Sequence, residues 1–155
     1  KHLSPFNHSF LSYRVKVPIF VARQLVKHEY MPWNEVSRRY VDDDPEFYFP
    51  ETYREKVKDK KQGSGGTHTW NERFKVDGED FCSEEQARMF LPLNTYTECI
   101  WSGTLGAFAK MLSLRLPSDT QEETRYISKA VYEEAVKLFP VSLKALLEEC
   151  YHVKR

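Results

Sequence analysis

Apolar and polar positions alternate in one long stretch of the chain, from His8 to Val17, which predicts a strand with one buried face. Its apolar positions are Leu11, Tyr13, Val15 and Val17. A second stretch, Leu93 to Ser102, is also expected to be extended and places Thr97, Cys99 and Trp101 on one face. A third extended segment is expected after Pro32.

Apolar residues at helical spacing predict four or five helices. The expected ranges are 18–28, 83–92, 104–116, 118–139 and 142–151. Pro18 suits a first helical position, Ser83 with Gln86 and Ser118 with Gln121 resemble capping boxes, and Ser142 is expected to cap the last helix. Strands and helices in this order indicate a single α+β domain over residues 1–155.

The apolar stripes of three of these helices define the expected core. The first helix carries Ile19, Ala22 and Val26. The helix of residues 104–116 carries Leu105, Phe108, Ala109 and Leu112, and the next turns Thr124, Ile127, Val131, Ala135 and Leu138 inward. Arg115 continues the stripe of residues 104–116, so it must find a partner or face a cleft. A structural salt bridge explains it as well as a functional role does.

Between these elements lies a charged, glycine-containing region. Residues 52–61 are expected to form a short helix, and residues 62–68, with three glycines, a flexible loop. A solvated linker is the simpler interpretation, and a mobile loop near a substrate is the alternative.

The composition excludes several classes of protein. The chain has 155 residues, and its 23 basic and 23 acidic residues cancel, which argues against a general nucleic-acid or membrane-surface binder. No stretch approaches the roughly 20 apolar residues of a membrane span, and no signal peptide is evident. Three cysteines without metal-type spacing and scattered histidines favour a cytoplasmic protein with reduced thiols and no metal site.

Candidate chemistry is concentrated between Arg23 and Tyr40. Gln24, Lys27 and His28 fall on one helical face, and after Pro32 a polar row alternates onto one side of the extended segment. Cations, an amide, a hydroxyl and a carboxylate together suit an anionic ligand with hydroxyls, such as a nucleotide. A solvated polar surface explains the same residues equally well.

Three ordered motifs resemble those of the flavin-dependent thymidylate synthases. The first is similar to the family's Gln-x-x-Arg-His-Arg…Asn-Glu-x-Ser-x-Arg-Tyr signature, through Gln24, His28, Asn34, Glu35, Ser37, Arg39 and Tyr40. Residues 2–8 resemble its His-x-Thr/Ser-Pro-Phe-Glu-His segment. Residues 85–92, 96–97, 114–115 and 121–123 resemble its Ala-Arg…Leu-Pro…Tyr-Thr…Leu-Arg…Gln-x-Glu run. Family members usually carry several dozen residues before these motifs, so we expect the N-terminal part to be missing.

The resemblance implies a fold, a reaction and a site. The fold would be a small antiparallel sheet with packed helices, and the reaction the methylation of dUMP to dTMP by a homotetramer. Methylenetetrahydrofolate would supply the carbon, and NADPH would reduce it through FAD. Arg115 would be catalytic, polarising the uracil ring. The residues implied to bind dUMP are Gln24, Leu25, Val26, Lys27, Glu35, Val36, Ser37, Arg38, Arg39 and Arg88. Those implied to bind FAD are Ser4, Lys27, His28, Glu29, Glu35, Thr104 and Lys110.

Departures from the family pattern cluster on the flavin side. Lys27 and Glu29 replace the two outer arginines of the signature, and Thr104 and Lys110 stand where asparagines are usual. Gly106 stands where an arginine is common. Two alternatives therefore stay open: transfer of another one-carbon group, such as hydroxymethyl, to a pyrimidine deoxynucleotide, and a catalytically silent nucleotide-binding paralogue.

Overall fold

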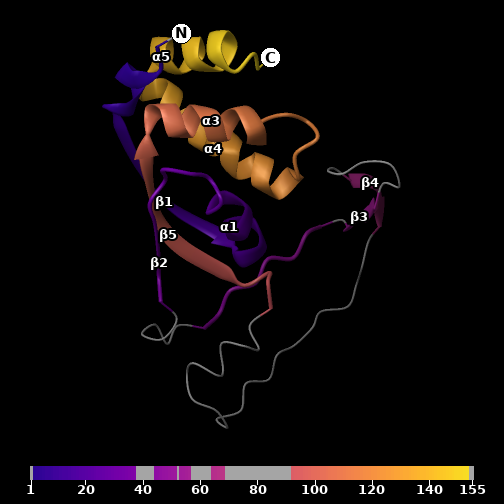
Figure 1. The fold of residues 1–155 in the computed structure, drawn as a ribbon. Helices are drawn as coiled ribbons and strands as arrows, with labels where there is room; N and C mark the ends of the chain where they lie inside the picture. The colour runs from indigo at the N-terminus through magenta and orange to yellow at the C-terminus, as the bar shows by residue number, and fades with distance from the viewer. Residues whose placement is uncertain (1, 38–43, 52, 57–63, 69–91, 154–155) are drawn as a thin grey trace.

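A three-stranded antiparallel sheet underlies the fold of the computed structural model, which describes residues 2–37, 44–51, 53–56, 64–68 and 92–153. The strand order is β1 (Phe10–Pro18), β5 (Tyr96–Thr104) and β2 (Trp33–Glu35). β1 and β5 pair over their full length, while the short β2 lies along the other side of β5 (Figure 1). β5 is thus the central strand, and both strands that pair with it come more than 60 positions earlier in the chain.

Alternation along β1 and β5 separates a buried from an exposed face, as the sequence predicts. Leu11, Val15, Val17, Thr97, Cys99 and Trp101 are buried, and Tyr13 is partly buried beside them. The other face carries polar pairs: the Ser12 and Ser102 hydroxyls lie 2.8 Å apart, and Arg14 bonds to Glu98. The predicted strands and their inward faces are confirmed.

Helices cover the buried face. α3 (Leu105–Arg115) follows β5 directly, and its N-cap Thr104 accepts a hydrogen bond from the Ala107 N–H at 3.1 Å. α4 (Glu122–Leu138) packs against α3, and α1 (Ile19–Leu25) contacts β1, β5 and α4. The remaining helical segments are a 3-10 turn η1 (Ser4–Asn7), α5 (Pro140–Ala145) and a π-helical turn η3 (Leu146–Cys150).

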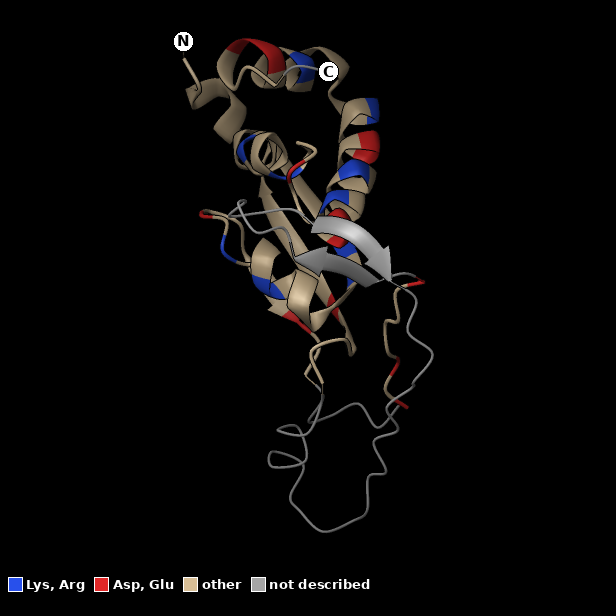
Figure 2. Cartoon of the chain, turned by 90° about the vertical axis from the view of Figure 1, so that its right-hand side faces the viewer, with Lys and Arg blue, Asp and Glu red and all other residues tan. Residues whose placement is uncertain are grey.

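The predicted stripe of α3 is confirmed, and those of α1 and α4 are partly wrong. Leu105, Phe108, Ala109 and Leu112 are all buried. In α1 the buried residues are Val21, Ala22 and Leu25, because the helix ends at Leu25 and leaves Val26 in the exposed turn that follows. In α4 the inward face is Thr124, Ser128, Val131 and Ala135, whereas Leu138 is 67% exposed at the last turn. Basic and acidic residues alternate along the outer side of α4 (Figure 2).

Three local predictions are wrong. Residues 53–56 and 64–68 form the hairpin strands β3 (Tyr53–Lys56) and β4 (Ser64–His68), not a helix and a loop. α4 begins at Glu122 without a capping box at Ser118, because the Gln121 side chain bonds to α1 instead. The last helical segment starts at Pro140 rather than at a Ser142 cap, since proline suits a first helical position. The helix expected at 83–92 lies outside the described residues.

Candidate functional site

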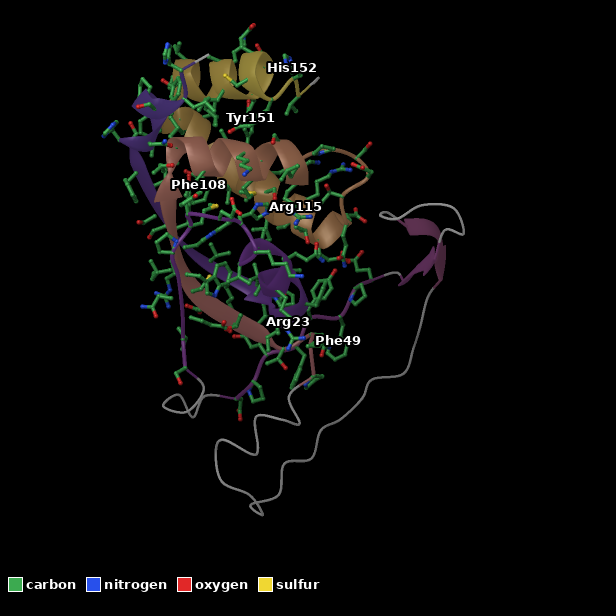
Figure 3. All side chains as sticks on the ribbon, viewed as in Figure 1. Arg23, Phe49, Phe108, Arg115, Tyr151 and His152 are labelled. Atoms are coloured by element: carbon green, nitrogen blue, oxygen red, sulfur yellow. The ribbon has the colours of Figure 1, made fainter. Side chains whose placement is uncertain are left out.

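The candidate site lies where the end of α3, the turn after α1 and the start of α4 meet. In Figure 3, Arg115 lies at the end of α3, above α1. Its Nε donates a hydrogen bond to Nε2 of His28 at 3.2 Å. The predicted catalytic residue and a predicted flavin-side residue are therefore in direct contact. Arg115 forms no salt bridge with any of the described residues. The structural ion pair that was the alternative to a functional role is therefore absent from this part of the chain.

His28 is a neutral side chain at physiological pH. Burial chiefly, and then the positive charges of Arg115 and Lys110, lower its pKa to about 4. Because Nε2 accepts the hydrogen bond from Arg115, the single ring proton resides on Nδ1. The sequence alone did not indicate this state, since His28 and Arg115 are 87 positions apart.

Gln24 ties α1 to the start of α4. Its amide nitrogen donates to the Gln121 side-chain oxygen, and its own oxygen accepts from the Thr124 hydroxyl at 3.0 Å. Thr124 is fully buried. Of the neighbouring residues predicted to bind dUMP, Leu25 is a fully buried core residue, and Val26 and Lys27 are exposed. Gln24 and His28 thus extend toward the same junction, and Lys27 does not share their contacts.

Glu35 lies on the inner side of β2. One carboxylate oxygen accepts from the Thr97 hydroxyl at 2.7 Å, and the other lies 3.4 Å from Nε1 of Trp33. The next residue, Val36, is exposed, and its N–H donates to the Glu98 carbonyl at 2.8 Å. Ser37 is half-buried. The predicted contacts Arg38, Arg39 and Arg88 lie outside the described residues.

The predicted flavin-side residues fall into two groups along α3. Ser4 of η1 lies near the start of this helix, where the Thr104 hydroxyl is 3.4 Å from Oδ1 of Asn7. Farther along, Nζ of Lys110 pairs with the Glu29 carboxylate at 3.7 Å. Thr104 and Lys110 are six residues apart, so the two groups lie about 9 Å from each other along the helix axis. A ligand that contacts both must span at least this distance.

Gly106 packs against η1. A Cβ placed there would lie 2.9 Å from the Asn7 side-chain oxygen Oδ1, which would have to move, and 3.7 Å, an ordinary contact distance, from the η1 backbone at Phe6. The structure gives no reason for a glycine where the family pattern commonly has an arginine.

Two cavities were not anticipated. One, of about 520 Å³, is bordered by aromatic and acidic side chains; its lining includes Tyr48, Phe49, Tyr96, Tyr126, Glu51, Glu122 and Glu123. Only the aromatic run at 47–49 gave a signal for it in the sequence. The other, of about 770 Å³, lies between the α3–α4 connection and the residues after η3.

The described ranges hold neither a metal site nor a membrane-spanning helix. No group of three His, Cys, Asp or Glu side chains there is arranged to hold a metal ion. None of the helices described is both long and apolar enough to cross a membrane.

Replacing Gln24 by alanine should destabilise the protein by about 1–3 kcal/mol, because the buried Thr124 hydroxyl loses its acceptor and α1 loses its link to α4. Denaturant unfolding of the variant measures this. Arg23→Ala, at the exposed neighbouring position, is the matched control and should change the free energy of unfolding by less than about 0.5 kcal/mol. Equal stability of the two variants would contradict a structural role for the Gln24 bridge.

Comparison with known proteins places this arrangement in a family. The chain matches the family described as thymidylate synthase complementing protein over residues 1–141. A flavin-dependent thymidylate synthase of Thermus thermophilus is 36% identical over 162 residues, which cover 96% of this chain and 60% of that protein. Its counterpart in Kosmotoga olearia is 32% identical over 176 residues, covering 97% of this chain and 73% of the relative. The chain thus spans less than two thirds of the Thermus protein.

A solved structure shares the fold. PolB of Streptomyces cacaoi, a UMP/dUMP methylase crystallised with 5-Br UMP, superposes with a TM-score of 0.75 at 24% sequence identity. The similarity covers 92% of this chain and 75% of that one. With a family match over most of its length and relatives above 30% identity, this chain belongs to the thymidylate synthase complementing protein family, whose matched members bear the name flavin-dependent thymidylate synthase.

Proposed function

We propose that the protein is a cytoplasmic, homotetrameric flavin-dependent thymidylate synthase that converts dUMP to dTMP. The hydrogen at C5 of the uracil would be replaced by a methyl group. Methylenetetrahydrofolate would supply the carbon at an oxidation level two electrons above methyl, so NADPH must provide one hydride equivalent, and the C5 hydrogen leaves as a proton. The family match supports this reaction, and the shared fold with PolB, a UMP/dUMP methylase, supports a uridine nucleotide as substrate.

The observation that carries the proposal is the state of Arg115. Its guanidinium is half-buried at the end of α3, and one nitrogen is held by a neutral imidazole rather than by a carboxylate. The positive charge is therefore not neutralised by an ion pair within the described part of the chain. An arginine in this state is suited to stabilise negative charge that develops on a uracil ring.

The described residues fit an extended, anionic cofactor such as FAD, with one local opposition. Thr104 and Ser4 offer hydroxyls at the start of α3, and Lys110 and the Nδ1–H of His28 offer donors farther along it, while Lys27 is exposed on the turn after α1. Glu29 opposes an anion there, although Lys110 partly offsets its charge. When bound, FAD would supply the hydride chemistry that amino-acid side chains lack.

The decisive experiment incubates the full-length protein with dUMP, methylenetetrahydrofolate, NADPH and FAD, and identifies the product by mass. Formation of dTMP supports the proposal. A product carrying a hydroxymethyl group would replace it with the alternative transfer reaction. Nucleotide binding without any product would identify a silent paralogue. A yellow purified protein would show in addition that flavin binding is retained.

Assembly provides an independent prediction. The outer face of the sheet exposes Phe10 (65%) and Ile100 (46%), apolar side chains that a neighbouring subunit would cover. We expect the full-length protein to sediment as a homotetramer. A stable monomer in light scattering at micromolar concentration would contradict this. Ile100→Lys should then weaken assembly, whereas Lys137→Ala, on the exposed side of α4, should not.

Glu29 should weaken FAD binding through its negative charge. Glu29→Arg places a second cation beside Lys110 and near Arg115. It changes the local charge by two units, so it is expected to tighten FAD by roughly 25-fold, or about fivefold for each exposed charge at close range. Glu29→Gln, which removes charge without adding any, should give an intermediate dissociation constant. Fluorescence titration of all three proteins tests the order. An affinity that does not change across the series would place the cofactor away from Glu29.

A further inference from the structure

We propose that His28 is a positioning residue, which holds Arg115 by its Nε so that the two terminal nitrogens of the guanidinium remain directed to the nucleotide. The inference rests on the proposed function insofar as it names the nucleotide as the ligand of Arg115. The contact itself, and the state of His28, can be tested without any ligand.

The geometry selects one nitrogen of the guanidinium. Arginine carries five N–H donors in a rigid, planar fork, and Nε contributes one of them at the base of the fork. His28 accepts from this Nε at 3.2 Å. Fixing Nε defines the plane of the whole group and leaves the paired terminal nitrogens for bidentate recognition. A contact to a terminal nitrogen would instead compete with the ligand.

The turn that carries His28 is itself fixed. The His28 N–H donates to the Leu25 carbonyl at 3.2 Å, and the Val26 N–H donates to that of Ala22 at 2.9 Å. One helical turn earlier, Gln24 attaches α1 to Gln121 and Thr124 of α4. The position of the imidazole is therefore set by the packing of α1 on α4, and it transmits that position to the end of α3.

The surrounding charges keep His28 in the accepting state. Burial chiefly disfavours a proton on the imidazole and so lowers its pKa, and the charges of Arg115 and then Lys110, which approach from α3, act in the same direction. Glu29, on the same turn, is engaged by Lys110. A protonated His28 could not accept from Arg115 and would repel it. The neutral ring with its proton on Nδ1 is the only form compatible with the contact.

A competing role is that His28 contacts only the flavin. The two roles differ in flavin-free protein, where a flavin contact cannot matter. A positioning residue must then still affect nucleotide affinity, and its pKa must rise when Arg115 is removed, by the part of the shift that Arg115 causes. A purely structural histidine would affect thermal stability alone.

The ligand-free test is an imidazole NMR titration of wild type and Arg115→Ala. We expect the His28 pKa to rise above about 4 in the variant by the part of the shift that Arg115 causes, while burial, the larger cause, continues to hold it below its ordinary range. The fixed Nδ1–H tautomer should be lost. His152, an exposed histidine, is the internal reference and should not shift. An unchanged His28 titration in Arg115→Ala would overturn the proposal, whatever the protein binds.

The ligand test measures dUMP affinity by calorimetry in flavin-free protein. His28→Ala should weaken binding roughly tenfold, because a hydrogen bond to a charged group is lost, and His28→Gln, a neutral acceptor, should restore most of it. In Arg115→Ala, the added His28→Ala change should have no further effect. Unchanged affinity in folded His28→Ala would overturn positioning. If wild type binds no dUMP, the proposed substrate fails instead, and the NMR titration alone decides the positioning role.

Discussion

Arg115→Ala should assemble normally and lose most of its dUMP-dependent turnover. Arg115 lies half-buried at the end of α3 and makes its described side-chain contact with a neutral histidine, not with a carboxylate. Removing it leaves no buried charge unpaired, so only a small loss of stability follows. If it stabilises charge on the uracil, its removal costs about 3–4 kcal/mol of transition-state stabilisation, or on the order of 10²–10³ in rate.

The test pairs a melting temperature with product formation on the same preparation. Lys137→Ala, which removes an exposed cation bound to Glu134 on α4, is the matched control and should change neither quantity. Normal turnover in Arg115→Ala would refute the catalytic role. A large fall in melting temperature with a proportionate loss of activity would show that Arg115 acts through packing of α3 on α1.

The sheet was predictable because its chemistry is local. In β1 and β5, one face is buried and the other is solvated, so apolar and polar residues alternate along the sequence of each strand. α3 was predictable for the same reason, since one stripe faces the core and Thr104 provides its cap. Pairing between β1 and β5, and the place of β2 beside β5, depend on residues far apart in the chain, so the alternation alone could not give them.

The predicted start of α4 was wrong because a residue far along the chain binds a side chain that matched a local capping pattern. Gln121 matched a capping pattern, but its amide bonds to Gln24, 97 positions away, so α4 starts without that cap. The error at Gly65–Gly66 has a local cause, because β4 forms a hairpin with β3 and the two glycines lie opposite the register shift between Arg54 and Lys56. At Gln121, in contrast, a tertiary contact outweighs a capping preference worth about 1 kcal/mol.

The site residues could be predicted one by one, but their contacts could not. Motif spacing predicted His28, Glu29, Lys110 and Arg115 as separate site residues. It could not show that Glu29 and Lys110, two departures from the family pattern, form one ion pair. Nor could it show that His28 accepts a hydrogen bond from Arg115. The charge reversal at Glu29 is accompanied by a new cation on α3, Lys110, which offsets part of the change. The two positions carry one positive charge in the family pattern and no net charge in this chain.

Phe108→Ala should cause a large loss of stability, about 3–5 kcal/mol. Phe108 is fully buried on α3, and its ring meets those of Tyr13 and Trp101 edge to face, with centroids 5.2 and 5.1 Å away. It therefore joins α3 to both long strands. For a protein of this size the loss corresponds to a fall in melting temperature of roughly 6–20 °C.

Two polar atoms beside Phe108 determine where in that range the value falls. The Tyr13 hydroxyl and the Trp101 indole N–H are buried and have no hydrogen-bond partner among the described residues, and burial raises the Tyr13 pKa to about 12. Water entering the cavity left by the alanine could bond to both, which would offset part of the loss. We therefore expect a loss near ~3 kcal/mol for Phe108→Ala, and about 1 kcal/mol for Phe108→Leu, which retains most of the volume.

Tyr126→Ala is the control, at a side chain that is 72% exposed on α4, and it should change stability by less than about 0.5 kcal/mol. Unfolding in urea measures all three, and a loss below about 1 kcal/mol for Phe108→Ala would show that this ring does not hold α3 on the sheet.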